Sequence, residues 1–274
     1  MAPDASLERL RVITDWGNWI FPFDDLFDSG ELRRDKGRAS ALMERILRPT
    51  EDDYDGDHGE TDGLEDFNRW IQFHDMVWQK LQEESPAHCT HYAQAMHDYA
   101  AWTLEQVEHA ASGHVISPGD LAKARRGSIC VKTLFALAAF GQNIVIPSAV
   151  QDHDSIKRLE ALSIDIVVIH NDLVSYTKEK NEGVEHNGII NLQKSGMPFQ
   201  DACNGLLRKA QDLTNELFFV FKNENRLTKN EQQHAEFLSR NPEFRDYVEL
   251  LRLVPQVNLH WSFMCERFRP EGCS

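Results

Sequence analysis

Hydrophobic residues recur at steps of three and four along most of the chain, which is the spacing of helices that bury one face. No segment shows a convincing alternation of period two, so strands are not expected. In the stretch LEDFNRWIQFHDMVWQKLQ, one apolar stripe consists of Phe67, Trp70, Ile71, Val77, Trp78 and Leu81. Further helices are predicted at residues 6–28, 32–47, 88–112, 118–141, 153–181, 198–224 and 242–268. The pattern predicts an all-α helical bundle.

The predicted helices are separated by residues with known roles at helix ends. Ser117 followed by Pro118 is typical of an N-cap with proline in the first turn. Gly183, the Gly196-Met197-Pro198 stretch and Asn241-Pro242 are typical helix stops or starts. These signals fix where the predicted helices turn.

Length and charge limit the class of protein. A chain of 274 residues can bury a substantial core, and one domain over residues 1–274 is the simpler organisation. The net charge of −15 argues against nucleic acid or an anionic membrane as partner, because both select basic surfaces. The acid surplus is compatible with binding metal cations.

Cysteine usage and hydropathy predict a soluble cytoplasmic protein. The five cysteines include no CxxC pair, which favours free thiols in a reducing compartment. The N-terminal MAPDASLERLR lacks the apolar core of a signal peptide. The apolar stretch at 133–141 is too short to cross a bilayer, so no stable membrane insertion is expected. Monomer and homodimer both remain open.

The acidic run TEDDYDGDHGETDG, residues 50–63, resembles a calcium-binding loop at first sight. Asp53, Asp55 and Asp57 alternate as calcium ligands do, but the glycine required next is His58. The closing position is Leu64 instead of a bidentate glutamate. A solvated loop is therefore favoured.

The stretch DDLFD places carboxylates on one helical face. Asp24 and Asp28 are four residues apart, with Asp25 beside them, so their side chains leave a helix on the same side. A solvated helix end explains this string equally well in so acidic a chain, and Pro22 removes a backbone donor just before it.

The stretch NDLVSYTKE carries a more specific pattern. Asn171, Ser175 and Glu179 stand at i, i+4 and i+8 and stack three oxygen donors along one helical face. Hard oxygen ligands suit Mg²⁺, which shares phosphate oxygens with a substrate, and Lys178 adds a positive charge for that phosphate. An exposed polar face is the alternative, but the preceding SIDIVVIH is so apolar that this helix is expected to be buried.

DDLFD and NDLVSYTKE together resemble the two metal motifs of class I terpene synthases. ARRGSI at 124–129 resembles the arginine pair of this family, and HWSFMCERF at 260–268 resembles the C-terminal W-S-x-x-x-x-R-Y segment of its fungal members. EGVEHNGII also resembles the fungal pattern. The resemblance extends over essentially the whole chain.

This resemblance implies one antiparallel helical bundle of the class I terpenoid synthase type that ionises a prenyl diphosphate. Farnesyl diphosphate is the expected substrate, and the product is a cyclic sesquiterpene hydrocarbon or alcohol. The implied ligands of three Mg²⁺ ions are Asp24, Asp25, Asp28, Asn171, Ser175 and Glu179. The implied diphosphate-binding residues are Arg125, Lys178 and Arg267, together with Asn171, Ser175 and Phe268.

Three departures from the family pattern stand in the sequence. Phe268 replaces a tyrosine that would hydrogen-bond diphosphate, and Ser128 and Ile129 follow the arginine pair where threonine and a small residue are common. Only 23 residues precede Asp24, whereas the family has about two further helices there. Part of the bundle wall is therefore expected to be missing.

Aromatic residues near the acids are candidates for contact with a carbocation, although ordinary core packing is favoured for each. These candidates are Trp16, Trp19, Phe21, Phe23 and Trp261.

Three rival interpretations remain. A prenyl-chain elongating enzyme would carry a second D-D-x-x-D, which the Asn/Ser/Glu pattern replaces. A catalytically silent terpene-synthase-like protein is the alternative from another class. Zinc binding through His88, Cys89 and His91 lacks a second ligand cluster, so a helix start with exposed histidines is favoured.

Overall fold

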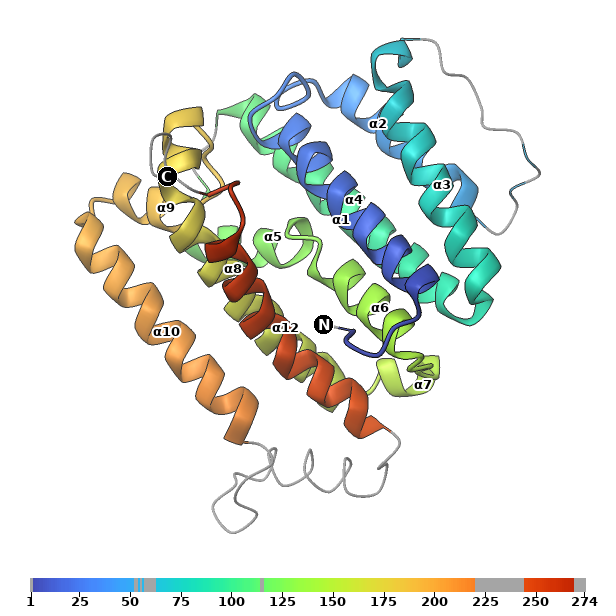
Figure 1. The fold of residues 1–274 in the computed structure, drawn as a ribbon. Coiled ribbons are helices and arrows are strands. Elements are labelled where there is room, and N and C mark those ends of the chain that lie inside the picture. Colours follow the sequence, from blue (N-terminus) through green and yellow to red (C-terminus); the bar gives the residue numbers. More distant parts are fainter. Residues whose placement is uncertain are drawn as a thin grey trace. The chain divides into compact units, whose positions relative to one another are not determined.

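The computed structural model describes residues 2–51, 54, 56, 63–113, 116–219 and 244–268. Within these ranges the regular structure is helical and contains no strand, which confirms the predicted all-α class (Figure 1). The helices are α1 (Leu7–Asp28), α2 (Lys36–Leu47), α3 (Asn68–Glu84), α4 (Pro86–Ser112), α5 (Pro118–Ser128), α6 (Val131–Gln142), α7 (Ser148–Gln151), α8 (Asp154–Glu182), α9 (Gly188–Lys194), α10 (Phe199–Phe219) and α12 (Arg245–Met264), with short 3-10 turns η1 (Arg48–Thr50) and η2 (Glu65–Phe67).

The described residues fall into two compact units. The N-terminal unit holds residues 2–145 and 182–186, and the C-terminal unit holds 146–181 and the described residues from 187 onward. Helix α8 therefore belongs to the C-terminal unit except for its last residue. The prediction of one domain over 1–274 stays a prediction.

The core of the N-terminal unit is built around α1, which contacts α3, α4 and α6 (Figure 1). The Trp19 and Phe23 rings stack with centroids 4.3 Å apart, and the Trp19 indole N–H donates to the carbonyl of Trp70 at 2.9 Å. Trp16 is also buried in this core, and the half-buried Phe21 packs against the core. The favoured interpretation of these α1 aromatics, core packing, agrees with their positions. Pro22 is exposed, and α1 continues through it.

The predicted helix at 118–141 is wrong in one respect, because the chain breaks it into α5 and α6. Cys130 adopts a left-handed conformation with φ of 59°, which interrupts the helix between Ser128 and Val131. Left-handed backbone is uncommon outside glycine, and no glycine or proline marks the position. The break places Arg125 in the last turn of α5.

The C-terminal unit is organised around α8, whose apolar stretch Ile164–Ile169 is largely buried, as the sequence predicted. Two hydrogen bonds join α12 to α8: the Ser163 hydroxyl donates to the Leu251 carbonyl at 2.7 Å, and the Tyr247 hydroxyl donates to Glu160 at 2.6 Å. Burial, reinforced by Glu160, raises the pKa of Tyr247 well above its ordinary value, so the hydroxyl keeps the proton that it donates.

Several predicted helix ends differ from the observed ones. The helix predicted from residue 32 begins at Lys36, because the Asp35 side chain caps it by accepting from the Arg38 N–H at 3.1 Å. The helix predicted to reach 268 ends at Met264. Ser117 caps α5 and Gly183, with φ of 70°, ends α8, both as predicted. Asn241-Pro242 and most of the acidic run at 50–63 lie outside the described residues.

Helix α5 approaches α4 closely at Gly127, where a Cβ atom would lie 1.9 Å from Cδ1 of Trp102. We expect Gly127→Ala to lower the free energy of unfolding by about 1–3 kcal/mol, because the Trp102 ring must move from its packed position. Gly17, inside α1, is the matched control, since nothing lies within 4 Å of a Cβ there. Gly17→Ala should be stabilising by about 0.5–1 kcal/mol through its higher helix propensity. Urea unfolding of both variants measures the difference, and a Gly127→Ala variant as stable as Gly17→Ala contradicts the packing argument.

Candidate functional site

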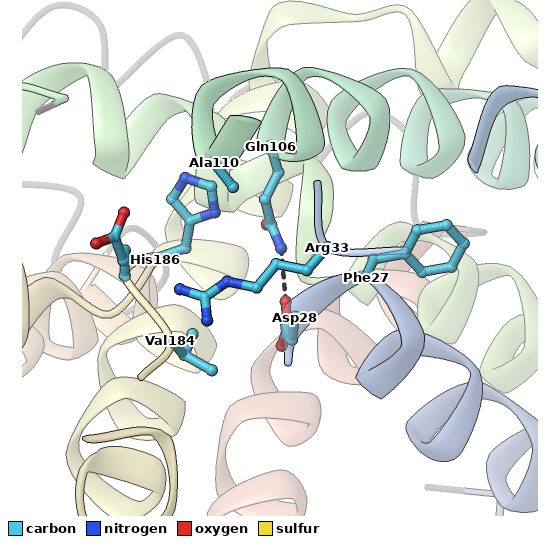
Figure 2. Close-up of a pocket in the computed structure, with 8 residues that line it drawn as sticks. Phe27, Asp28, Arg33, Gln106, Ala110, Val184 and His186 are labelled. Atoms are coloured by element: carbon cyan, nitrogen blue, oxygen red, sulfur yellow. Dashed lines mark hydrogen bonds between the residues drawn. The ribbon is translucent and has the colours of Figure 1, made fainter. Parts of the chain in front are cut away.

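The aspartates of DDLFD lie in the last two turns of α1, and α4 supplies hydrogen-bond donors to two of them. The Tyr99 hydroxyl donates to Asp24 Oδ1 at 2.7 Å, and the Gln106 amide donates to Asp28 Oδ1 at 2.5 Å (Figure 2). Tyr99 and Gln106 are seven residues apart, so both donors lie on one face of α4. Asp24 and Asp28 therefore share a face, as their spacing predicted, and Asp25 between them is half-buried.

Tyr99 acts as a hydrogen-bond donor toward Asp24. Burial first, and then the nearby Asp24 carboxylate, raise the pKa of Tyr99 well above its ordinary value. The phenol therefore stays protonated at physiological pH and donates its proton to the Asp24 carboxylate.

A small, partly open hollow, here called the Asp28 hollow, lies beside the end of α1. Figure 2 shows the Arg33 side chain extending across it, and this guanidinium donates to the carbonyl of Gly183. The hollow is lined by Phe27, Asp28, Arg33, Gln106, Ala110, Val184, Glu185 and His186.

Arg125 belongs to the same region of the N-terminal unit. It is buried, with 6% of its surface exposed, in the last turn of α5. Burial, followed by the positive charge of Arg125, lowers the pKa of His186 from 6.5 to about 4, and His186 lines the Asp28 hollow. The structure therefore brings the last aspartate of DDLFD and the predicted Arg125 into one neighbourhood.

The second predicted cluster lies on α8 in the C-terminal unit. Ser175 and Glu179 are buried, whereas Asn171 and Lys178 are half-buried. The Ser175 hydroxyl donates to the backbone carbonyl of Asn171 at 2.7 Å, so its proton is directed along the helix. The lone pairs of the Ser175 oxygen can then accept or coordinate.

The turn into α9 holds this face of α8. The Asn187 amide donates to Glu179 Oε2 at 2.9 Å and to the Asp172 carbonyl at 2.8 Å. The Gly188 N–H donates to the Asp172 carboxylate at 2.9 Å. Asp172, although it stands inside the motif NDLVSYTKE, therefore directs its carboxylate to the start of α9.

Arg267 and Phe268 follow the end of α12. The Arg267 guanidinium lies 5.8 Å from the centre of the Phe268 ring, and the edge of that ring meets Trp261 at a centroid distance of 6.2 Å. All three side chains are half-buried. The ring that replaces the expected tyrosine thus contacts both an indole and a guanidinium.

The donor set fits a hard divalent cation. Carboxylate, amide and hydroxyl oxygens are the ligands of Mg²⁺, and the six predicted ligands comprise these groups alone. No three His, Cys, Asp or Glu side chains within the described ranges form a preformed metal-binding group. The predicted ligand set, which includes three aspartates on α1 and an amide, a hydroxyl and a carboxylate on α8, therefore stays a prediction.

The zinc alternative does not fit the surroundings of His88. This side chain is 2% exposed, which corrects the expectation of exposed histidines. Its two ring nitrogens lie 2.8 Å from the Ser85 hydroxyl and 3.0 Å from the Ile144 carbonyl. Both nitrogens are occupied by hydrogen bonds, and His88 is a structural residue at the start of α4.

Three residues of this site were missed by reasoning from the sequence. Tyr99 and Gln106 lie far from both motifs in the chain, and only tertiary packing brings them to the aspartates. Asn187 stands in EGVEHNGII, eight residues after Glu179, where its position directly before Gly188 indicates an N-cap. That signal was present but does not reveal the contact with Glu179.

Comparisons with known proteins show the family of the chain. Residues 15–216 match the family model described as terpene synthase family 2, C-terminal metal binding. The chain is 30% identical to (+)-eremophilene synthase of Gibberella fujikuroi over 98% of its own length and 72% of that protein. It is 29% identical to silphinene synthase of Penicillium patulum over 97% of its length and 69% of that protein.

A solved structure shares the fold. It is that of linalool/nerolidol synthase from Streptomyces clavuligerus in complex with 2-fluorogeranyl diphosphate, with a TM-score of 0.74 at 20% identity, covering 97% of this chain and 84% of that one. The predicted class I terpenoid synthase fold is confirmed.

Among the described helices, none is both long and apolar enough to span a membrane.

The lowered pKa of His186 leads us to expect that the free energy of unfolding falls in acid. Its pKa is depressed in the folded state, so its stabilising contribution is full above about pH 6.5 and is lost as pH falls toward 4. Between pH 7 and pH 5 this amounts to about 2 kcal/mol, because the unfolded chain takes up a proton that the folded chain excludes. Between pH 7 and pH 5, we expect the free energy of unfolding of His186→Gln to fall by about 2 kcal/mol less than that of the parent chain. Denaturant unfolding at both pH values measures it, and equal losses in the two proteins contradict the assignment.

Proposed function

Because the chain belongs to terpene synthase family 2, we propose that it is a Mg²⁺-dependent sesquiterpene synthase that ionises farnesyl diphosphate and cyclises the resulting cation. Terpene synthase activity and dependence on a divalent metal follow from the family. The identity of the metal, a number of three ions and the C15 substrate are the proposal. The observation that carries it is the joint presence of the acidic face on α1 and the Asn/Ser/Glu face on α8.

We assign Asp24, Asp25 and Asp28 to one part of the metal site and Asn171, Ser175 and Glu179 to the other. Tyr99 and Gln106 support the first part, because neutral donors orient the aspartates and leave their charge for a cation. When bound, Mg²⁺ neutralises the charge that develops on the departing diphosphate. In a prenyl diphosphate, the diphosphate is the anionic head that the metal site would bind, and the rest of the molecule is a hydrocarbon tail.

Arg125, Lys178 and Arg267 are assigned to the diphosphate itself. A guanidinium presents several N–H donors that match phosphate oxygens, and Arg125 is held buried near the Asp28 hollow. These cations stabilise the negative charge of the leaving group, so the carbon–oxygen bond breaks without a protein nucleophile. Phe268 lies beside Arg267 as a ring without the hydroxyl that a tyrosine would donate.

The C15 chain length rests on the relatives, whose names describe eremophilene and silphinene synthases. The fold relative, in contrast, holds a geranyl analogue. Geranyl diphosphate is therefore the comparison substrate.

The proposed function is tested by incubating the purified full chain with Mg²⁺ and farnesyl diphosphate. Volatile products are identified by gas chromatography with mass spectrometry, and released diphosphate is measured in parallel. We expect a sesquiterpene and stoichiometric diphosphate, with slower turnover of geranyl diphosphate. Folded protein that releases neither product from either substrate is the catalytically silent alternative.

The α8 ligands predict a large loss of turnover upon substitution. We expect Asn171→Ala and Glu179→Ala each to lower kcat by at least about 100-fold, because each removes an oxygen ligand from the diphosphate-binding site. Circular dichroism should show that both variants remain folded.

Thr177→Ala is the matched control for these variants, since Thr177 lies on the same helix and is exposed. It should retain the parent rate. Unchanged turnover in both Asn171→Ala and Glu179→Ala would contradict the assignment of α8 as a metal-binding helix.

A further inference from the structure

We propose that Asn187 is a positioning residue for the metal-binding face of α8, acting by orienting Glu179 and Ser175. This inference rests on the proposed function and deepens it, because it concerns the same metal site. Asn187 is fully buried, with 0% of its surface exposed. An amide at such a position must place its donors and its acceptor in hydrogen bonds.

The Asn187 side chain connects two helices. Its Nδ2 atom donates to the Asp172 carbonyl at 2.8 Å and to Glu179 Oε2 at 2.9 Å, and it lies 3.4 Å from the Ser175 hydroxyl. Its Oδ1 atom accepts from the backbone N–H groups of Ile189 and Ile190 at 2.9 and 3.3 Å. The acceptor therefore caps α9, while the donors are directed to α8.

The backbone around Asn187 is anchored independently. The next residue, Gly188, donates its N–H to the Asp172 carboxylate at 2.9 Å, and a Cβ atom at 188 would lie 2.7 Å from that oxygen. Further along, Tyr176 donates its hydroxyl to Gln193 at 2.8 Å. Because the residues that follow Asn187 are held to α8, the backbone from which its amide reaches Glu179 is fixed.

A neutral donor is suited to a carboxylate that must also bind a cation. A lysine or arginine in the same place would neutralise Glu179 and compete with the metal. The amide instead holds one carboxylate oxygen and leaves the negative charge in place. Loss of that bond removes one of the contacts that orient Glu179, so more of its ordering must occur when the metal binds, which weakens metal binding.

Capping alone does not account for these contacts, because an N-cap needs only an acceptor. Serine caps helices as well as asparagine does but has no amide donor that reaches Glu179. Asn187→Ser therefore separates the two roles.

The matched control is Asn204→Ser, which makes the same chemical change in the same unit. Asn204 accepts from Gln200 on α10 at 3.1 Å and touches none of the proposed ligands.

The experiment measures Mn²⁺ binding to the full chain by electron paramagnetic resonance, in the presence of inorganic diphosphate. The increase in Tm caused by Mg²⁺ with diphosphate is the second readout. We expect Asn187→Ser to keep the Tm of the metal-free parent within a few degrees and to weaken Mn²⁺ binding by about 10- to 100-fold. Asn204→Ser should bind as the parent does.

Asn187→Thr, which also keeps a capping oxygen, replaces Asn187→Ser if that variant does not fold, and the same loss is expected. Mn²⁺ affinity within twofold of the parent in the folded variant overturns the positioning role and leaves the proposed function standing. A parent chain that neither binds Mn²⁺ nor gains Tm with Mg²⁺ and diphosphate overturns both.

Discussion

The site depends on orienting carboxylates in a partly buried environment through hydrogen bonds from neighbouring elements. Asp24, Asp28 and Glu179 each accept a hydrogen bond from an uncharged side chain on a neighbouring element. Such bonds fix the direction of the carboxylates and offset part of their desolvation. An ion pair also occurs in the N-terminal unit, where Arg45 pairs with Asp75 at 2.9 Å.

The same constraint explains the buried cation near the acids. Arg125 has little exposed surface, and after burial its positive charge is the next cause of the lowered pKa of His186. A buried guanidinium requires anionic or dipolar partners to offset desolvation. A diphosphate headgroup would add such a partner, so the residues that bind the leaving group are expected to be stabilised by it.

The sequence predicted those features that depend on local spacing. The faces of α1 and α8 follow from the helical repeat, so the amino-acid spacing alone groups Asp24 with Asp28, and Asn171 with Ser175 and Glu179. The break at Cys130 could not be predicted, because a left-handed cysteine has no compositional signal. The donors Tyr99, Gln106 and Asn187 also escaped prediction, since hydrogen bonds between helices depend on packing that one sequence does not reveal.

The central claim is that the two motif faces bind one Mg²⁺–diphosphate group. The most direct measurement is a crystal structure of the full chain grown with Mg²⁺ and inorganic diphosphate. The account predicts metal ions bound by carboxylates of DDLFD and by Asn171, Ser175 and Glu179, with diphosphate oxygens shared between them and contacted by Arg125. Diphosphate bound elsewhere, with Asp24 and Glu179 directed to solvent and free of metal, would contradict it.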